Sequence, residues 1–156
     1  MELPSNWIKR SDGKYDVNGT IGSYELQSFV ENGQLDNSFG NVTGDLLIYN
    51  LAVEAIKISG SFAYGNFIFD NCKKLQELKG PVIINGDFKL CNCPSLTKMY
   101  DVCFIGGSFI CENCDALKLR PEQLPHKVRG DFTWLNCPFT RDEIEYRCRV
   151  DGTINV

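Results

Sequence analysis

The chain has 156 residues, 43% of them hydrophobic and 12% aromatic, which is enough for one domain with a sizeable core. Its 16 Lys and Arg residues against 20 Asp and Glu residues give a formal net charge of −4, which disfavours both a phosphate-binding surface and a nucleic-acid mimic. Residues 1–7 lack a basic stretch followed by an apolar run, and no window approaches about 18 apolar residues. We therefore expect a soluble, cytoplasmic protein that binds neither nucleic acid nor membrane.

A repeat organises the chain. A glycine recurs every 21 to 25 residues, at Gly19, Gly44, Gly65, Gly86, Gly107, Gly130 and Gly152. A period of this size indicates a solenoid, in which each repeat is one rung that buries its apolar face only by stacking on its neighbours. We predict a mainly β, single-domain parallel β-solenoid, similar to a leucine-rich repeat, with about seven rungs of roughly 21–23 residues.

Apolar residues flank each glycine with the spacing of a strand. Val42 and Leu46, or Ile84 and Phe88, stand two positions before and two positions after their glycine. Apolar residues two positions apart predict one short strand per rung with one face buried, and stacked rungs predict a parallel sheet. In the alternation of inward and outward residues, the glycine falls at an inward position. It therefore either makes room for the neighbouring phenylalanines or marks a bulge with positive φ.

Two polar or small residues complete each central rung. Asparagine stands six positions after the glycine, and in four of the five rungs cysteine follows it. We interpret the asparagines as groups that satisfy the backbone at the turn of the adjacent rung, and the cysteines as small buried hydrophobes. This structural ladder consists of Asn50, Asn71, Asn92, Asn113 and Asn136 with Cys72, Cys93, Cys114 and Cys137.

The two ends are expected to close the solenoid. Residues 1–39 form an N-terminal cap and first rung, in which Trp7, Ile8 and Tyr15 cover the apolar edge, and residues 40–138 form the central repeats. In the C-terminal cap, residues 139–156, the sequence Thr-Arg-Asp-Glu at 140–143 is typical of a capping box, which predicts a helix of about 8 to 9 residues. We expect residues 150–156 to be a last edge strand.

The repeat resembles cysteine-containing leucine-rich repeats. More closely, it is similar to short repeat proteins of tailed bacteriophages and gut bacteria, in the segment Asp-Gly-Lys-Tyr-Asp-Val-Asn-Gly-Thr at 12–20, in Phe-Gly-Asn-Val-Thr-Gly-Asp at 39–45, in the Gly-Asp-Phe and Asn-Cys motifs, and in the final residues 139–156. The rung after Gly44 departs from the pattern at residues 51–56. The resemblance implies a solenoid without a shared activity or catalytic residues. If it reflects the source, it implies a factor in the host cytoplasm that binds and blocks a host protein, such as a component of antiviral defence.

Cysteine and histidine residues are candidates for metal ligands and nucleophiles. Cys91 and Cys111 have opposite parity on their strands, so the closely spaced cysteines at 91, 93, 111 and 114 do not converge on one tetrahedral point. Cys103, His126 and Cys148 occupy one position in successive rungs and are the better zinc candidate. A partly buried histidine between two thiols is the simpler interpretation. We expect no catalytic residues, no metal and no cofactor, with a small zinc-binding protein as an alternative.

The residues that alternate with the buried ones along each strand face outward, and an unexpected number of them are apolar. A merely solvated sheet is polar on this face, whereas apolar patches with a polar rim tend to mark interaction surfaces. We predict a non-enzymatic protein-binding module whose partner contacts Leu47, Tyr49, Tyr64, Ile68, Lys89, Ile110, Arg129 and Leu135. Three alternatives stay open. The face packs on other parts of the chain or reflects β-propensity alone, it pairs two copies in a homo-oligomer, or the chain is a virion-associated structural protein.

Overall fold

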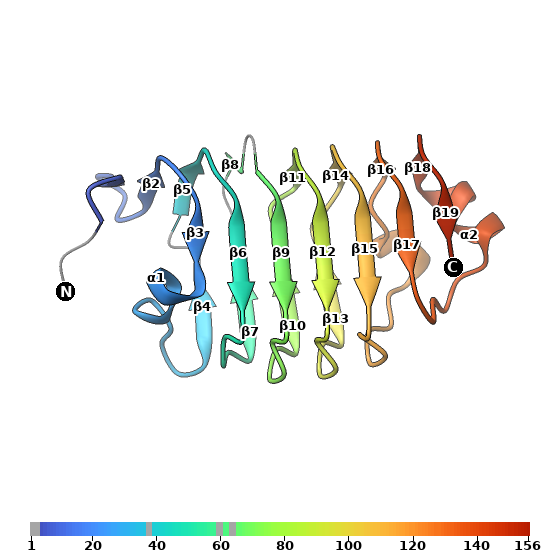
Figure 1. Ribbon diagram of the computed structural model, residues 1–156, viewed down its shortest axis with the longest axis horizontal. Helices are drawn as coiled ribbons and strands as arrows, with labels where there is room; N and C mark the ends of the chain where they lie inside the picture. Colours follow the sequence, from blue (N-terminus) through green and yellow to red (C-terminus); the bar gives the residue numbers. More distant parts are fainter. Residues whose placement is uncertain (1–3, 37–38, 59–60, 63–64) are drawn as a thin grey trace.

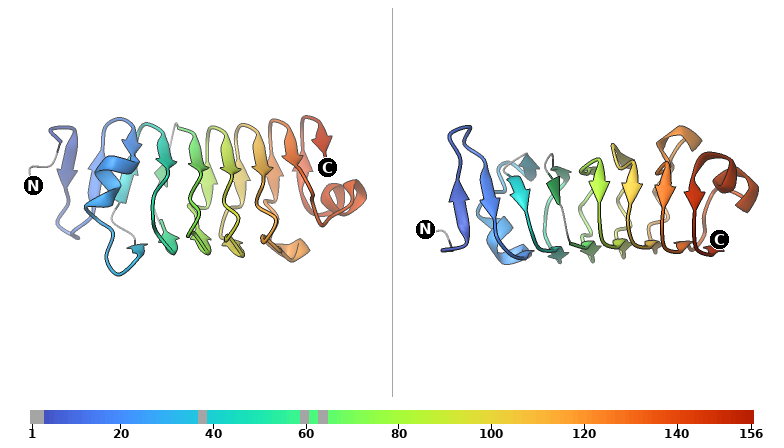
Figure 2. Two further views of the ribbon diagram at one scale, coloured as in Figure 1. Left: turned by 60° about the horizontal axis from the view of Figure 1, so that its bottom comes forward. Right: turned by 90° about the horizontal axis from the view of Figure 1, so that it is seen from above.

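The computed structural model describes residues 4–36, 39–58, 61–62 and 65–156. The chain winds into an elongated β-solenoid, with its first and last rungs at opposite ends (Figure 1). Successive rungs stack their strands side by side into three sheets, which form the three sides of the coil (Figure 2). The predicted mainly β, parallel solenoid is therefore confirmed.

Within the described residues, sheet A has eight strands, and all neighbouring strands in it are parallel except the first pair, β1 and β2. It lies along the side seen from above (Figure 2). In spatial order its strands are β1 (Trp7–Lys9), β2 (Tyr15–Val17), β5 (Phe39–Val42), β8 (Ser61–Phe62), β11 (Ile83–Ile84), β14 (Phe104–Ile105), β16 (Lys127–Val128) and β18 (Arg149–Val150).

Sheet B has seven parallel strands and faces the viewer in Figure 1. It contains the strands that the glycine repeat predicts, and neighbouring rungs align residue for residue, for example Phe67 with Phe88 and Phe109. Its strands are β3 (Ile21–Gly22), β6 (Leu46–Tyr49), β9 (Phe67–Asp70), β12 (Phe88–Cys91), β15 (Phe109–Glu112), β17 (Phe132–Trp134) and β19 (Ile154–Asn155).

Sheet C has four parallel strands and closes the third side. Its buried positions include Leu78 and Met99, the leucine-like positions of the sequence pattern. The strands are β4 (Gln34–Asp36), β7 (Ala55–Lys57), β10 (Glu77–Lys79) and β13 (Lys98–Tyr100). A central rung such as β11, β12 and β13 thus contributes three strands, where the repeat predicted one, because the apolar positions on either side of the glycine lie on two different sheets.

The space between the sheets is filled by aromatic and aliphatic side chains. Phe67, Phe88, Phe109 and Phe132 are fully buried and stack rung on rung, with ring centroids 6.0, 5.5 and 5.0 Å apart. Aromatic pairs at this spacing contribute packing energy beyond the area they bury. The core is therefore one continuous column along the solenoid axis.

The repeated glycines stack directly on one another. The N–H of Gly86 donates to the carbonyl oxygen of Gly65 over 3.0 Å, and a Cβ atom at Gly86 would lie only 2.6 Å from that oxygen. Gly107, Gly130 and Gly152 continue the same series of hydrogen bonds. The interpretation as a bulge was wrong, because the stacked glycines from Gly44 to Gly152 do not have positive φ. The atoms nearest to an added Cβ belong to the preceding rung: they are backbone atoms and, from Gly86 on, also a side-chain oxygen such as that of Asn66.

At the N-terminal end, Trp7 is buried and its ring stacks on Phe29 at a centroid distance of 5.3 Å. Tyr15 and Phe39 pack around the same rings, so Trp7 and Tyr15 cap the core as predicted. The inclusion of Ile8 in this cap was wrong, because its side chain is 64% exposed on the outer face of β1. Helix α1 (Ser23–Gln27), which places Leu26 in the core, was not predicted.

At the C-terminal end, helix α2 (Arg141–Arg147) follows the predicted capping box. The Thr140 hydroxyl accepts from the Glu143 N–H over 3.3 Å, and the Glu143 carboxylate accepts from the Thr140 N–H over 2.8 Å. Phe139 and Ile144 are buried beside it. The single edge strand at 150–156 was wrong: β18 and β19 belong to two different sheets, and Gly152 lies between them.

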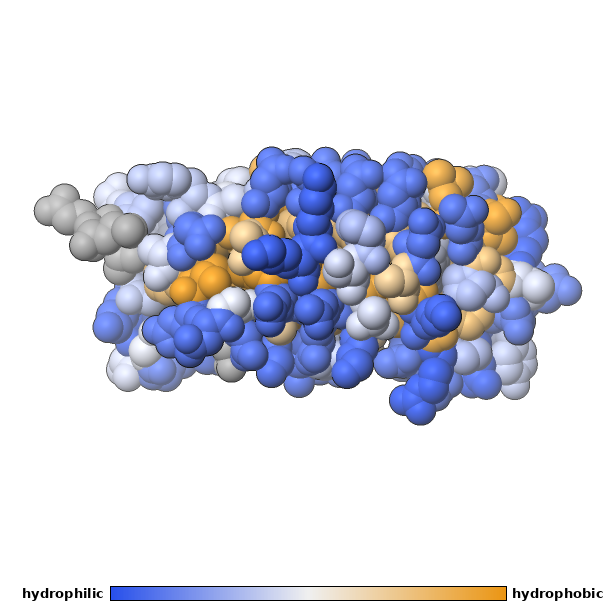
Figure 3. All heavy atoms as spheres, turned by 90° about the horizontal axis from the view of Figure 1, so that it is seen from below, coloured by the Kyte–Doolittle hydropathy of each residue, from blue (hydrophilic) through white to orange (hydrophobic). Residues whose placement is uncertain are grey.

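A single turn of 3₁₀ helix, η1 (Pro121–Gln123), precedes β16. None of the described helices combines the length and the apolar character needed to cross a bilayer. On the side seen from below, hydrophilic residues cover most of the surface, and hydrophobic residues show between them in an interrupted band along the long axis (Figure 3).

Candidate interaction face

The outer face of sheet B carries a central column of long side chains. Leu47, Ile68, Lys89 and Ile110 lie on β6, β9, β12 and β15 and pair directly across neighbouring strands. All four are half-buried, while the residues before and after them point into the core. Parallel strands lie about 4.8 Å apart, so this column presents one side chain per rung at a fixed spacing.

A second column flanks the first and ends in exposed apolar residues. Tyr49, Asp70, Cys91 and Glu112 align across β6, β9, β12 and β15. Tyr49 is 43% exposed, and Leu135, at the equivalent position of the next rung, is 51% exposed. Leu47, Ile68 and Ile110 therefore form an apolar stripe, with Tyr49 and Leu135 in the neighbouring column near its two ends. Lys89 interrupts the stripe, and its ammonium lies 3.7 Å from the Asp87 carboxylate.

A third column, at the corner between sheets A and B, fastens the rungs together. Each side chain accepts a hydrogen bond from the backbone N–H one rung further on: Asp45 from Asn66 (2.6 Å), Asn66 from Asp87 (2.8 Å), Asp87 from Ser108 (2.8 Å), Ser108 from Asp131 (3.0 Å) and Asp131 from Thr153 (2.8 Å). Hydrogen bonds that satisfy backbone N–H groups stabilise the fold, and those to a charged acceptor are the stronger ones. This corner column is structural, and its aspartates also make one edge of the face acidic.

One of the predicted contact residues, Arg129, lies apart from this stripe. The guanidinium of Arg129 lies over the ring of Phe104 on sheet A, 5.5 Å from its centroid. Arg129 therefore belongs to the neighbouring side of the solenoid. Tyr64 lies outside the described residues.

The asparagine ladder forms, but for a different reason from the predicted one. Asn50, Asn71, Asn92, Asn113 and Asn136 all have φ between 52° and 60°, the left-handed region that asparagine tolerates better than other residues with a side chain. Their side-chain amides bond to other side chains. The Asn71 amide donates to Asn50, that of Asn113 to Asn92 over 2.8 Å, and that of Asn92 to Asp70 over 2.8 Å. The sequence predicted that this ladder would hydrogen-bond to the backbone of the adjacent rung. The side chains of the corner column make those hydrogen bonds instead.

The cysteine ladder is buried as predicted at Cys72, Cys93 and Cys114, while Cys137 is half-buried. Hydrogen bonding with Cys114 raises the pKa of the Cys93 thiol to about 12, and hydrogen bonding with Cys111 raises that of Cys114 to about 12. Hydrogen bonding with Cys93 and, to a smaller extent, burial also raise the pKa of the Cys72 thiol. Because the thiolate is the nucleophile and the metal ligand, these thiols are held in their inert form.

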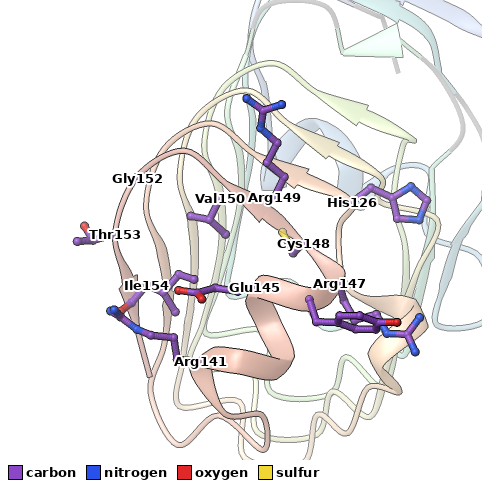
Figure 4. A pocket seen from close by; sticks show the side chains of 11 residues that line it. His126, Arg141, Glu145, Arg147, Cys148, Arg149, Val150, Gly152, Thr153 and Ile154 are labelled. Carbon is purple, nitrogen blue, oxygen red and sulfur yellow. The ribbon is translucent and has the colours of Figure 1, made fainter.

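The column of Cys103, His126 and Cys148 does not make a ligand set. The His126 N–H donates to the Cys103 carbonyl over 2.8 Å, so the backbones stack as predicted. However, the Cys148 side chain is buried and the His126 side chain is exposed, and the two point away from each other (Figure 4). No group of three or more His, Cys, Asp or Glu side chains suited to a metal ion occurs among the described residues.

A cavity of about 580 Å³ lies at the C-terminal cap between α2, β18 and β19. Arg141, Arg147 and Arg149 line it, but their guanidinium groups diverge instead of meeting at one point (Figure 4). Arg141 donates to the carbonyl oxygen of Ile154 over 2.6 Å, and Arg149 pairs with Asp151 over 3.2 Å. Arg147 lies over the ring of Tyr146, 5.0 Å from its centroid. The cavity is therefore a gap in the cap, and each of these three cations is engaged locally.

Sequence reasoning missed the exposed apolar residues of sheet A. Val82 and Ile83 are 56% and 50% exposed, and Phe104 beside them is half-buried. The signal was present three positions before the glycine, where Ile83, Phe104, Lys127 and Arg149 recur in successive rungs. It was overlooked because the glycine repeat predicted only one strand in each rung.

The thiols provide a test of the cysteine assignment. All eight cysteines are free; Cys91, Cys103 and Cys137 are half-buried and the others are buried. In the native protein we expect a maleimide to label only these three, and labelling at the other five only after denaturation. Mass spectrometry of labelled peptides checks this. Stoichiometric zinc, together with chelator-accelerated labelling of Cys148, would contradict the assignment and favour the zinc-binding alternative.

The C-terminal cap is expected to loosen in acid. Hydrogen bonds from the Thr153 hydroxyl and N–H lower the pKa of Asp131 from its usual 3.8, and bonds from the Thr140 N–H and hydroxyl lower the pKa of Glu143 from its usual 4.5. Because the folded pKa values are the lower ones, these bonds stabilise the cap above the unfolded pKa and are lost as pH falls through the folded pKa, below about pH 4. The protection of the Thr153 and Glu143 amides, which is the intrinsic exchange rate divided by the observed rate, should therefore fall there, before that of amides in the central rungs.

The control for this prediction removes the titrating groups. In a variant with Asp131→Asn and Glu143→Gln, the protection of the cap amides should no longer change over this pH range. An equal loss of protection in the central rungs and the cap, or an unchanged pH dependence of protection in the variant, would contradict the assignment.

The chain was compared with protein-family models, with curated proteins and with solved structures, and none of the three comparisons finds a match.

Proposed function

We propose that the protein is a non-enzymatic protein-binding module that holds its partner on the outer face of sheet B. The observation that carries the proposal is the stripe of Leu47, Ile68 and Ile110, presented at one side chain per rung beside the exposed Tyr49 and Leu135 of the neighbouring column. Each rung is held by its neighbours through backbone bonds, the corner column and the aromatic core. A partner therefore meets a face that is already ordered, which limits the entropy lost on binding.

The charges around the stripe indicate the chemistry of the partner. Asp45, Asp87 and Asp131 line one edge, Asp70 and Glu112 lie on the other side of the central column, and Lys89 is the cation among them. Apolar contact at the centre with complementary charges at the rim is the usual arrangement of a specific interface. We propose a partner that presents an apolar segment bordered by lysine or arginine residues.

The resemblance to repeat proteins of tailed bacteriophages supports one source of such a partner. In that setting the partner is a host protein, and binding blocks its activity, for instance within an antiviral defence system. The proposal of a binding face does not depend on this step, which rests on the resemblance alone.

The test is capture of the partner by immobilised protein from a lysate of the source cell or its host. The variant Ile68→Asp with Ile110→Asp places two charges in the stripe and is expected to lose the captured protein. The matched control, Gln34→Asp with Gln76→Asp, adds the same charges on the sheet C side of the solenoid and should retain it. Both variants are first checked for native circular dichroism, and Ile68→Thr with Ile110→Thr, which keeps β-branched residues, replaces the stripe variant if that does not fold.

The captured protein is then purified and its affinity measured directly. We expect the stripe variant to bind at least about tenfold more weakly than both the wild type and the control. Equal affinity of the stripe variant and the wild type would overturn the proposal. So would a specific loss of binding in the sheet C control.

A further inference from the structure

The exposed side of sheet A carries a patch with a chemistry opposite to that of sheet B. Ile83, Phe104, Lys127 and Arg149 pair across β11, β14, β16 and β18, so that they form one outward column. The residues that follow them on β11, β14 and β16, including Ile84 and Ile105, are fully buried. Together with Val82 and Arg129 the four define the sheet A patch, which is apolar toward the N-terminal end and cationic toward the C-terminal end.

The cations of this patch exceed the carboxylates that face them. Lys127 and Arg149 share Asp151, at distances of 3.5 and 3.2 Å. Arg129 lies over the ring of Phe104, and it has no ion pair within the described part of the chain. The patch is thus positive on a protein whose overall charge is −4.

The outer face of sheet B combines apolar and acidic side chains in the rungs that matter here. Its central column runs from Leu47 and Ile68 through Lys89 to Ile110, and Asp45, Asp70, Asp87 and Glu112 lie beside this column in the same four rungs. On both faces the side chains of a column repeat once per rung, about every 4.8 Å. Two such columns can therefore stay aligned over several rungs.

We infer that the sheet A patch docks on the outer face of sheet B of a second copy of this chain, with the two axes parallel. A stagger of two rungs, about 10 Å, places Ile83 against Leu47 and Phe104 against Ile68. The same stagger places Lys127 near Asp87 and Arg149 near Glu112. Lys89 lies in the same rung as Asp87 and already pairs with it over 3.7 Å, so Lys127 and Lys89 share this carboxylate in the contact.

This contact uses two different surfaces, so it is heterologous. Each copy can offer its sheet A patch to one neighbour and its sheet B face to another, which produces an open chain of copies instead of a closed dimer. Since the contact covers the face assigned to a partner under the proposed function, self-association and partner binding compete. The inference itself does not require that partner.

The test is sedimentation velocity of the full chain over a wide concentration range, at low and at high salt. We expect a mass that rises with concentration and falls with added salt, because screening weakens charge pairs. Arg149→Glu and Glu112→Arg should each weaken association by about tenfold. The double variant, which restores opposite charges in the reversed sense, should recover it. The control Lys73→Glu makes the same charge change at an exposed loop position and should associate like the wild type.

Two results would overturn the inference. One is a monomeric mass at every concentration and salt. The other is association that Arg149→Glu leaves intact, or that the double variant does not restore, since either would place the contact elsewhere. The proposed function is tested separately, because partner affinity is measured at concentrations where the wild type is monomeric, and Arg149→Glu should not reduce that affinity.

Discussion

Gly86→Ala is expected to destabilise the protein by about 3 kcal/mol, at the upper end for an inserted methyl group. The added Cβ would lie 2.6 Å from the carbonyl oxygen of Gly65 and 2.8 Å from its carbonyl carbon. That oxygen accepts the Gly86 N–H over 3.0 Å, so relief of the clash lengthens one of the hydrogen bonds that join the two rungs. Urea unfolding followed by far-ultraviolet circular dichroism measures the change.

A matched control separates the steric clash from the backbone preference of glycine. Gly13 has φ of +84°, and a Cβ atom added there would meet no other atom within 4 Å, so Gly13→Ala should cost only the left-handed penalty of about 1 kcal/mol. A loss at Gly86 no larger than that at Gly13 would show that the backbones of neighbouring rungs are not in close contact at the glycines.

Phe88→Ala is expected to cost about 3 to 5 kcal/mol. The ring is fully buried and packs between Phe67 and Phe109, at centroid distances of 6.0 and 5.5 Å, so its removal leaves a cavity in the middle of the aromatic column. Because each rung is stabilised mainly by its neighbours, the rungs on both sides lose contacts at once. This loss is a large part of the about 5 to 15 kcal/mol that a domain typically has.

Thermal and urea unfolding measure this second effect. Tyr146→Ala is the control, because Tyr146 is 81% exposed on α2 and its removal should change stability by less than about 0.5 kcal/mol. If Phe88→Ala unfolds with the stability of the wild type, the stacked core is wrong.

Much of the fold could be predicted because one physical requirement repeats. One side chain must be buried in every rung, as at Phe67, Phe88 and Phe109. Apolar residues therefore recur at a regular spacing in the sequence, which can be recognised without knowing the conformation of the turns. The cap at Thr140 was predictable for a different reason, since a capping box is a local pattern whose partners lie three residues apart.

The three-sided cross-section was not predictable in the same way. Sheets A and C contribute only two or three residues to most rungs, for example Ile83–Ile84, and so short a strand has too few positions to show alternation. The asparagines illustrate another limit. The sequence shows that an asparagine recurs at the position of Asn92. Its positive φ and the hydrogen bond of its side-chain amide depend on how the chain turns.

The candidate face was predicted in part. The parity of the strands was enough to place Leu47, Ile68 and Ile110 on one outward column, because register and alternation are linked in a stacked sheet. Arg129 was misplaced, since it stands at a corner, where the next residue along the chain turns to another side. Parity cannot assign a residue at a corner to either face.

The most direct test of the central claim is a methyl nuclear magnetic resonance titration, with isoleucine-labelled protein and the purified partner. Isoleucines report on each part of the molecule separately: Ile68 and Ile110 on the outer face of sheet B, Ile83 on sheet A, and Ile144 in the C-terminal cap. We predict that partner binding shifts the methyl signals of Ile68 and Ile110 and leaves those of Ile83 and Ile144 in place. Shifts confined to Ile83 or Ile144 would contradict the claim, because they would place the partner on a different side of the solenoid.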